Sequence, residues 1–141
     1  MTNCIQAAFS SGGGGGATVT SQEISPTENQ TTTSTTVTDI SSAAATLADR
    51  DDGKAFCNFF ANIEMSDSTQ KVNIGFELDG TDKNMTSTHT TSNNVTGAIS
   101  LSQVFDTGGG TLQLRWRVAG GTATLANGAE YMSRCTIFEV S

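Results

Sequence analysis

The side chains with the greatest capacity for chemistry are one histidine, three cysteines and a group of aspartates. His89 lies between Thr88 and Thr90, with no carboxylate or cysteine at the spacing of a catalytic triad or a metal site. The glycine run Gly12 to Gly16 lacks the Lys and Ser/Thr of a phosphate-binding loop, and no serine-hydrolase or zinc-protease motif occurs. The sequence therefore predicts no enzyme, no cofactor and no metal site, and His89 is interpreted as a solvated side chain.

The aspartates are concentrated in the segment Asp49-Arg50-Asp51-Asp52-Gly53. Calcium needs about six to eight oxygen ligands, and the full ligand spacing with a terminal Glu is absent. Asp accepts local backbone hydrogen bonds and Gly permits positive φ, so the segment is predicted to be a turn that closes a hairpin.

The three cysteines, Cys4, Cys57 and Cys135, have spacings that match no zinc or redox motif. Cys57 and Cys135 lie inside apolar strand patterns and are predicted to be free, buried thiols.

Strand patterns must position these groups. Thr111 to Ala119 alternates Leu, Leu, Trp and Val with polar residues, which directs Trp116 inward and leaves Arg115 and Arg117 to pair with acids on a neighbouring strand. Lys54 to Ile63 is apolar on both faces and is predicted to be central. Thr31 to Ile40 is predicted to be a Thr-rich edge strand, and Lys71 to Asp79 a half-buried strand that ends in the Asp79-Gly80 turn. Thr81 to Asn94 is predicted to be a long exposed loop, and Gly120-Gly121 a hairpin turn. About nine short strands without helical periodicity predict an all-β fold, a two-sheet antiparallel sandwich with jelly-roll topology.

Composition limits both the core and the partners. Leu, Ile, Val and Phe supply 27 of 141 residues and Thr supplies 23, so the core is lean and we expect a homo-oligomer that completes it. A net charge of -7 disfavours nucleic acid. No apolar run is long enough to cross a membrane, and no secretory leader is recognised, so synthesis in a cytoplasm is expected.

Residues 1–18 are interpreted as an N-terminal arm, and residues 19–141 as the β-sandwich domain. The arm carries the apolar residues Ile5, Ala7, Ala8 and Phe9 ahead of the glycine run, which is typical of a flexible tether. Two interpretations stay open for it: a disordered tail, or an apolar peptide that docks on a larger partner.

The C-terminal part of the chain carries a resemblance to a known group of proteins. T-L-Q-L-R-W-R-V-A-G-G-T-A-T-L (Thr111 to Leu125) and R-C-T-I-F-E-V (Arg134 to Val140) resemble the ending of small tailed-phage virion proteins. Those proteins have a jelly-roll domain of the tumour-necrosis-factor and complement-C1q type. T-T-T-S-T-T-V-T-D-I (Thr31 to Ile40), A-D-R-D-D-G-K-A-F (Ala48 to Phe56) and F-E-L-D-G-T (Phe76 to Thr81) resemble successive strands and turns of the same domains.

The resemblance implies a trimeric, non-enzymatic bacteriophage structural protein on the virion surface, made in the host cytoplasm. It further implies a capsid decoration or head-fibre protein that attaches to the major capsid protein or another virion protein through Ile5, Ala7, Ala8 and Phe9. Phe56 and Phe60 would then be trimer contacts around a threefold axis; the alternative is that these two rings fill the core. The alternative function is the receptor-binding tip of a tail fibre, which contacts a host-surface glycan or protein through a loop containing Lys83, Asn84, His89 and Asn93.

Overall fold

The computed structural model describes residues 18–26, 28–67, 69–88, 96–127 and 132–140. Every regular element in this part of the chain is a β-strand, which confirms the predicted all-β class. The strands are β1 (Val19–Ile24), β2 (Gln30–Thr32), β3 (Thr38–Thr46), β4 (Asp49–Met65), β5 (Val72–Leu78), β6 (Thr81–Thr88), β7 (Thr96–Gly108), β8 (Thr111–Val118), β9 (Ala123–Ala126) and β10 (Arg134–Val140).

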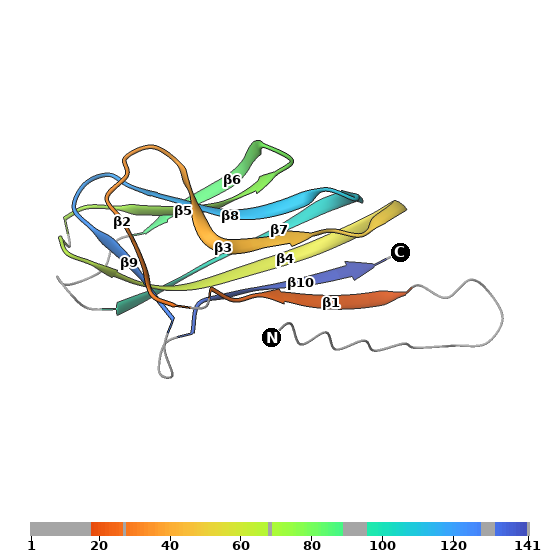
Figure 1. Ribbon diagram of the computed structural model, residues 1–141, viewed down its shortest axis with the longest axis horizontal. Helices are drawn as coiled ribbons and strands as arrows, with labels where there is room; N and C mark the ends of the chain where they lie inside the picture. Colours follow the sequence, from red (N-terminus) through yellow and green to blue (C-terminus); the bar gives the residue numbers. More distant parts are fainter. Residues whose placement is uncertain (1–17, 27, 68, 89–95, 128–131, 141) are drawn as a thin grey trace.

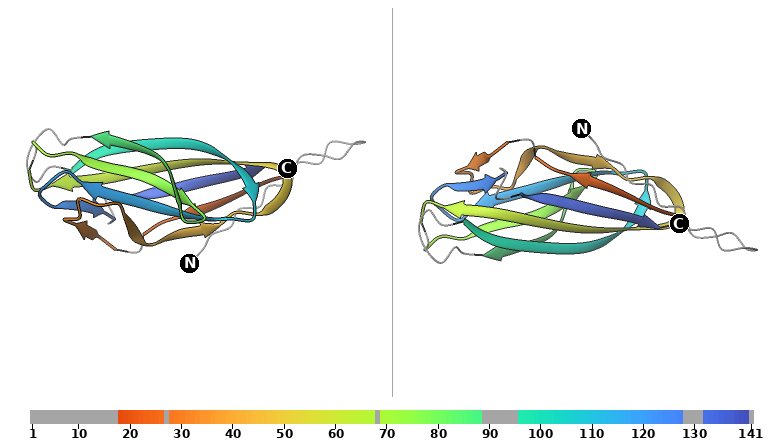
Figure 2. Two further views of the ribbon diagram at one scale, coloured as in Figure 1. Left: turned by 90° about the horizontal axis from the view of Figure 1, so that it is seen from above. Right: turned by 90° about the horizontal axis from the view of Figure 1, so that it is seen from below.

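The strands form two antiparallel sheets that pack face to face (Figure 1). The six-stranded sheet has the order β1-β10-β4-β9-β2, with β7 paired to the other side of β4. The four-stranded sheet has the order β3-β8-β5-β6. In both views of Figure 2 the long strands run along the same axis of the molecule, as in an aligned β-sandwich.

The pairing of eight strands identifies the topology. Strands near the two ends of the sequence pair with each other, and so do strands progressively closer to its middle. β1 pairs with β10, β3 with β8, β4 with β7, and β5 with β6, all antiparallel. The contacts β10–β4 and β8–β5 then join these nested pairs into two sheets. This nesting is the jelly-roll arrangement, so the predicted two-sheet sandwich and its topology are confirmed. The predicted division at residue 19 coincides with the first residue of β1; the arm lies outside the described residues and stays a prediction.

The core lies between the sheets and follows the alternation seen in the sequence. Phe59 of β4 and Phe76 of β5 are both fully buried, with ring centroids 6.5 Å apart. Phe105 of β7 meets Phe76 edge-to-face at 5.5 Å. Trp116 is 2% exposed, as predicted. Each buried aromatic side chain contributes about 1.5–3 kcal/mol by leaving water, so this small cluster is a main source of stability.

The predicted turn at Asp49 to Gly53 is wrong, because β4 begins at Asp49 and continues through the segment. Asp49 pairs with Gly108 of β7, and the register shifts between Asp49 and Lys54. Between these two pairs β4 advances five residues while β7 advances two. Such an irregular bulge accepts extra residues without ending the strand, and it tolerates the residue types that also favour turns. The long partner strand β7 therefore overrides the local turn signal.

The predicted loop at Thr81 to Asn94 is also wrong in its first half, where β6 pairs with β5. The preceding turn is correct: Asp79 and Gly80 both have positive φ, 49° and 75°, as a two-residue hairpin requires. β6 is the edge strand of its sheet, so its Thr-rich sequence needs no regular apolar face. Without apolar alternation, the sequence did not predict this strand.

Two further segments differ in detail. The predicted strand Thr31 to Ile40 is split into the end of β2 and the start of β3, which lie at the edges of different sheets. Gly120-Gly121 does turn the chain, with Gly121 at φ 72°, but it closes no hairpin. The chain crosses there from β8 in one sheet to β9 in the other, where β9 pairs with β2 and β4.

Candidate association surface

Three apolar side chains form a row across the outer face of the six-stranded sheet. Phe56 of β4 lies directly opposite Phe138 of β10 on one side and Val104 of β7 on the other. Side chains at such positions share one face of a sheet, with Cβ atoms about 4.5–5.5 Å apart. Phe56 and Phe138 are each 43% exposed and Val104 is 55% exposed. We call this row the apolar stripe.

Two nearby rows on the same face, one on each side of the stripe, carry two more exposed apolar residues and paired charges. Val140 is opposite Lys54, whose Nζ forms an ion pair with Asp106 of β7. On the other side, Phe60 is opposite Arg134, and the Arg134 Nη1 atom lies 3.9 Å from the Glu23 carboxylate of β1. The charges of these two ion pairs sum to zero, whereas the whole chain carries -7. A second copy of this acidic chain would meet less repulsion here than over the molecule as a whole.

Polar groups separate the stripe from Phe60. Asn58 lies opposite Thr136 and donates a hydrogen bond from Nδ2 to Oγ of Ser102, at 3.1 Å. A depression of about 320 Å³ is lined by Asn58, Phe60, Arg134 and Thr136. An apolar centre with a polar margin is the usual composition of a protein–protein interface.

The stripe is backed by the buried core on the inner side of the same strands. Cys57 and Ile137, which follow and precede the stripe phenylalanines, are fully buried. Near the end of β10, the buried Glu139 carboxylate accepts a hydrogen bond from the Ala48 N–H at 2.7 Å and one from the Thr20 hydroxyl at 3.4 Å. These bonds join β10 to its neighbour β1 and to the connection between β3 and β4, which fixes the strand that carries Phe138.

The two buried cysteines are unreactive thiols. Cys57 and Cys135 are free and buried, as predicted; Cys4 lies outside the described residues. Burial, assisted by the Glu139 charge, raises the pKa of Cys57 from 9.0 to about 12. Burial also raises the pKa of Cys135, and the neighbouring Cys57 adds to the effect. Both thiols therefore stay protonated near neutral pH and lack the thiolate that reactivity requires.

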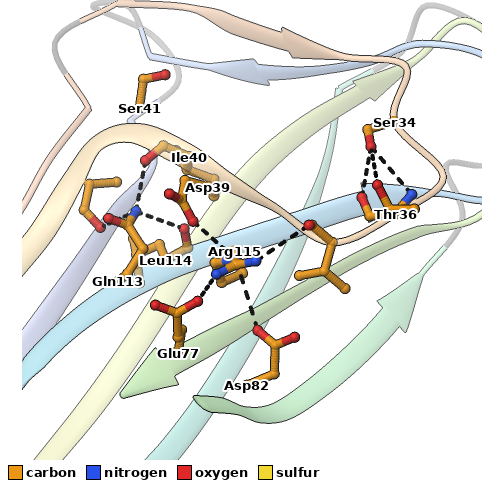
Figure 3. A network of polar contacts seen from close by, with 12 residues as sticks. Ser34, Thr36, Asp39, Ile40, Ser41, Glu77, Asp82, Gln113, Leu114 and Arg115 are labelled. Carbon is orange, nitrogen blue, oxygen red and sulfur yellow. Dashed lines mark hydrogen bonds and ion pairs between the residues drawn. The ribbon is translucent and has the colours of Figure 1, made fainter. Parts of the chain in front are cut away.

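The outer face of the four-stranded sheet has a different character. Arg115 of β8, 16% exposed, makes ion pairs with Glu77 of β5, with Asp39 of β3 at 3.1 Å, and with Asp82 of β6 at 3.9 Å (Figure 3). It also donates a hydrogen bond to the Val37 carbonyl at 3.3 Å. This network links all four strands and confirms the predicted pairing of Arg115 with acids on neighbouring strands.

A glutamine beside this network stabilises an irregular part of β3. The Gln113 amide donates hydrogen bonds to the Ile40 and Ala43 carbonyls at 2.9 and 3.1 Å, where the register of β3 shifts (Figure 3). Ser42 within this bulge has a positive φ of 54°. The exposed large apolar side chains of the described residues all lie away from this sheet; they are Phe56, Phe60, Val104, Met132, Phe138 and Val140.

The predicted site residues fall into three groups. Phe56 and Phe60 point outward on β4, 43% and 39% exposed, so the alternative that they fill the core is wrong. Lys83 and Asn84 lie on the strand β6 and not in a loop. The remaining predicted residues lie outside the described part of the chain, so their roles stay predictions; they are Ile5, Ala7, Ala8, Phe9, His89 and Asn93.

Sequence reasoning missed Val104, Phe138 and Val140. The signal was present in the last strand, where Cys135 and Ile137 alternate with Phe138 and Val140, so that both faces are apolar. A strand with two apolar faces at the surface of a sandwich indicates that its outer face has a partner.

Among the described residues, no group of three or more His, Cys, Asp or Glu side chains is placed to hold a metal ion. A search of the same residues for a helix long and apolar enough to cross a membrane finds none.

No protein-family model and no curated protein matches the sequence. Among solved structures, the chain is similar to part of latent PorU from Porphyromonas gingivalis, with a TM-score of 0.57 and 8% identity over 96% of this chain and 14% of that one. It is also similar to the Eiger TNF of S. frugiperda (TM-score 0.49, 7% identity, 86% of this chain and 90% of that one). A third similarity is to VP2 of infectious bursal disease virus (TM-score 0.46, 10% identity, 89% and 36%). The likeness to PorU supports the fold alone, and the two lower scores add nothing to it.

Proposed function

We propose that this chain is a non-enzymatic structural protein of the bacteriophage virion surface, a capsid decoration or head-fibre protein that assembles as a homotrimer. The observation that carries the proposal is the apolar stripe on the six-stranded sheet. The assignment to a phage particle rests on the sequence resemblance to tailed-phage virion proteins.

Self-association would remove the stripe from water. A phenylalanine side chain offers about 150–250 Å² of surface, so covering the exposed 43% of Phe56 or Phe138 contributes about 2 kcal/mol. Phe60 adds a third ring at the margin of the same face. When copies meet through this face, the ion pairs at the interface carry no net charge, and the rest of the acidic surface stays in solvent.

Attachment to the particle is assigned to the arm, through Ile5, Ala7, Ala8 and Phe9. An apolar peptide ahead of a folded domain can dock in a groove or on a strand edge of a larger partner, here the major capsid protein or another virion protein. The sandwich would then project from the particle surface.

The test is immunogold electron microscopy of particles assembled with the full chain or with a chain that lacks residues 1–16. The proposal predicts gold on the capsid surface with the full chain and its loss with the truncated chain, while the truncated protein remains folded by circular dichroism. Full labelling by the truncated chain would reject the arm as the anchor, and gold at the tail would favour the fibre-tip alternative.

A receptor-binding tip is the second candidate, and the depression beside Phe60 favours it. An aromatic ring next to amide, hydroxyl and guanidinium groups suits a sugar, which offers both apolar faces and hydroxyls. This site differs from the predicted loop of Lys83 and Asn84. Replacing Arg134 and Asn58 by Ala should then reduce adsorption to host cells without changing particle assembly; unchanged adsorption would reject this candidate.

A further inference from the structure

We propose that, in the free subunit, the arm of the same chain covers the apolar stripe and withholds it from other copies until the arm engages the particle. This inference rests on the proposed function, because it assigns a second role to the stripe and to the arm. The occupant is residues 5–9, Ile-Gln-Ala-Ala-Phe, whose placement lies outside the described part of the chain.

The chain enters the fold beside the stripe. Val19, the first residue of β1, pairs with Val140 of β10, and two residues later Ser21 pairs with Phe138 of the stripe. The stripe lies on the next three strands, β10, β4 and β7. At the usual spacing of neighbouring strands, the distance from β1 to β7 is about 14 Å.

The spacer between the apolar peptide and β1 is long enough for this contact. Residues 10–18 number nine, of which five are glycine. Nine residues reach at most about 30 Å, and a glycine-rich chain of this length has a root-mean-square span of about 16 Å. The apolar peptide can therefore reach every part of the stripe without strain.

The chemistry of the peptide also fits the stripe. Residues 1–18 contain no charged side chain, although the chain carries 21 Lys, Arg, Asp and Glu residues. In an extended backbone, Ile5, Ala7 and Phe9 project to one side. Such a peptide can cover Phe56 and Phe138 without burying an unpaired charge beside the ion pairs that flank them.

Covering by the same chain has an energetic advantage over covering by another. A short tether holds the peptide at an effective concentration on the order of 1 mM, above ordinary protein concentrations. If the peptide binds the stripe with a dissociation constant of about 0.1 mM, only about a tenth of the subunits are open. All three copies of a trimer must be open, so the concentration at which trimers form rises about 30-fold. Docking of the arm on a capsid would restore the lost affinity where assembly is needed.

A nitroxide on Cys4 tests the contact in the full chain. Cys57 and Cys135 are buried, so labelling of the native protein is directed to Cys4 and is verified by mass spectrometry. The inference predicts paramagnetic broadening of the backbone amide signals of Phe56, Val104 and Phe138, with the Arg117 amide of the opposite sheet as control. The double variant Ile5→Asp, Phe9→Asp should lose the broadening.

The outcomes separate the inference from the proposed function. Broadening that persists on dilution supports the contact within one chain, whereas broadening that disappears on dilution, or none at the stripe, overturns it. Sedimentation of the chain without residues 1–16 should show self-association at an about 30-fold lower concentration than the full chain. Equal association of both chains overturns the inference alone. Failure of both to associate, with broadening retained, overturns the proposed function and leaves the arm contact in place.

Discussion

Phe56 of β4 and Phe138 of β10 lie directly opposite each other, and both rings are 43% exposed on the outer face of the six-stranded sheet. The residues next to them, Cys57 and Ile137, are fully buried on the inner face. The two strands therefore have an apolar side chain on each face at this level, and the outer one is left exposed by the part of the chain that the structure describes. Contiguous exposed apolar residues of this kind mark interaction surfaces.

The Arg115 network predicts that Arg115→Met destabilises the fold by about 1–3 kcal/mol. The substitution keeps most of the side-chain volume but leaves the part-buried Glu77 carboxylate without its cation. Urea unfolding monitored by Trp116 fluorescence measures the change. The matched control is Lys54→Met, which removes an exposed ion pair worth about 0–1 kcal/mol. Equal effects of the two substitutions would show that the network contributes no more to stability than an exposed ion pair.

Gly75 predicts a steric test in the hairpin of β5 and β6. A Cβ atom at this buried position would lie 2.6 Å from Cγ of Met85 and 2.9 Å from the Asn84 carbonyl oxygen. Gly75→Ala should therefore cost about 1–3 kcal/mol, because the backbone oxygen cannot move aside as a side chain can. Gly108→Ala, where nothing lies within 4 Å of the added atom, should be nearly neutral in the same thermal unfolding assay. A neutral Gly75→Ala would contradict the pairing of β5 with β6.

The raised thiol pKa values predict a loss of stability at alkaline pH. Above pH 9 the unfolded chain releases the Cys57 proton, while the folded chain retains it up to about pH 12. Within this window the unfolded state binds fewer protons, so the free energy of unfolding falls as pH rises, by up to about 1.4 kcal/mol per pH unit for each thiol. Guanidine unfolding at pH 8 and pH 10 should show a smaller decrease in the variant Cys57→Ala, Cys135→Ala. Identical decreases would mean that the thiols are not protected by burial.

The sequence predicted the fold well where packing enforces alternation. The inner faces of β4, β5 and β8 are occupied by the residues that the period of two selected, because those side chains fill one core. The prediction failed at Asp49 to Gly53 and at β6, where pairing with a long or neighbouring strand outweighs local turn and loop propensities. Such pairing is a property of the tertiary structure, and a local window does not contain it.

The candidate site was predicted only in part for a related reason. Phe56 and Phe60 stood out because they oppose the main apolar face of a single strand. Val104 and Phe138 belong to strands 48 and 82 residues further along the chain, and only the register of β7 and β10 against β4 brings them beside Phe56. The apolar stripe is therefore formed by the pairing of three strands, and no single segment of the sequence contains it.

Self-association through the apolar stripe is the central claim, and sedimentation velocity of the chain lacking residues 1–16 tests it most directly. The wild-type truncated chain is predicted to form a trimer, and Phe56→Asp should weaken association by about 2 kcal/mol or more, roughly 30-fold, because it places a charge in the stripe. Ala44→Asp, which adds the same charge to exposed β3 in the other sheet, should leave the trimer intact. A truncated chain that sediments as a monomer at all concentrations, or a Phe56→Asp variant that associates as strongly as Ala44→Asp, would contradict the claim.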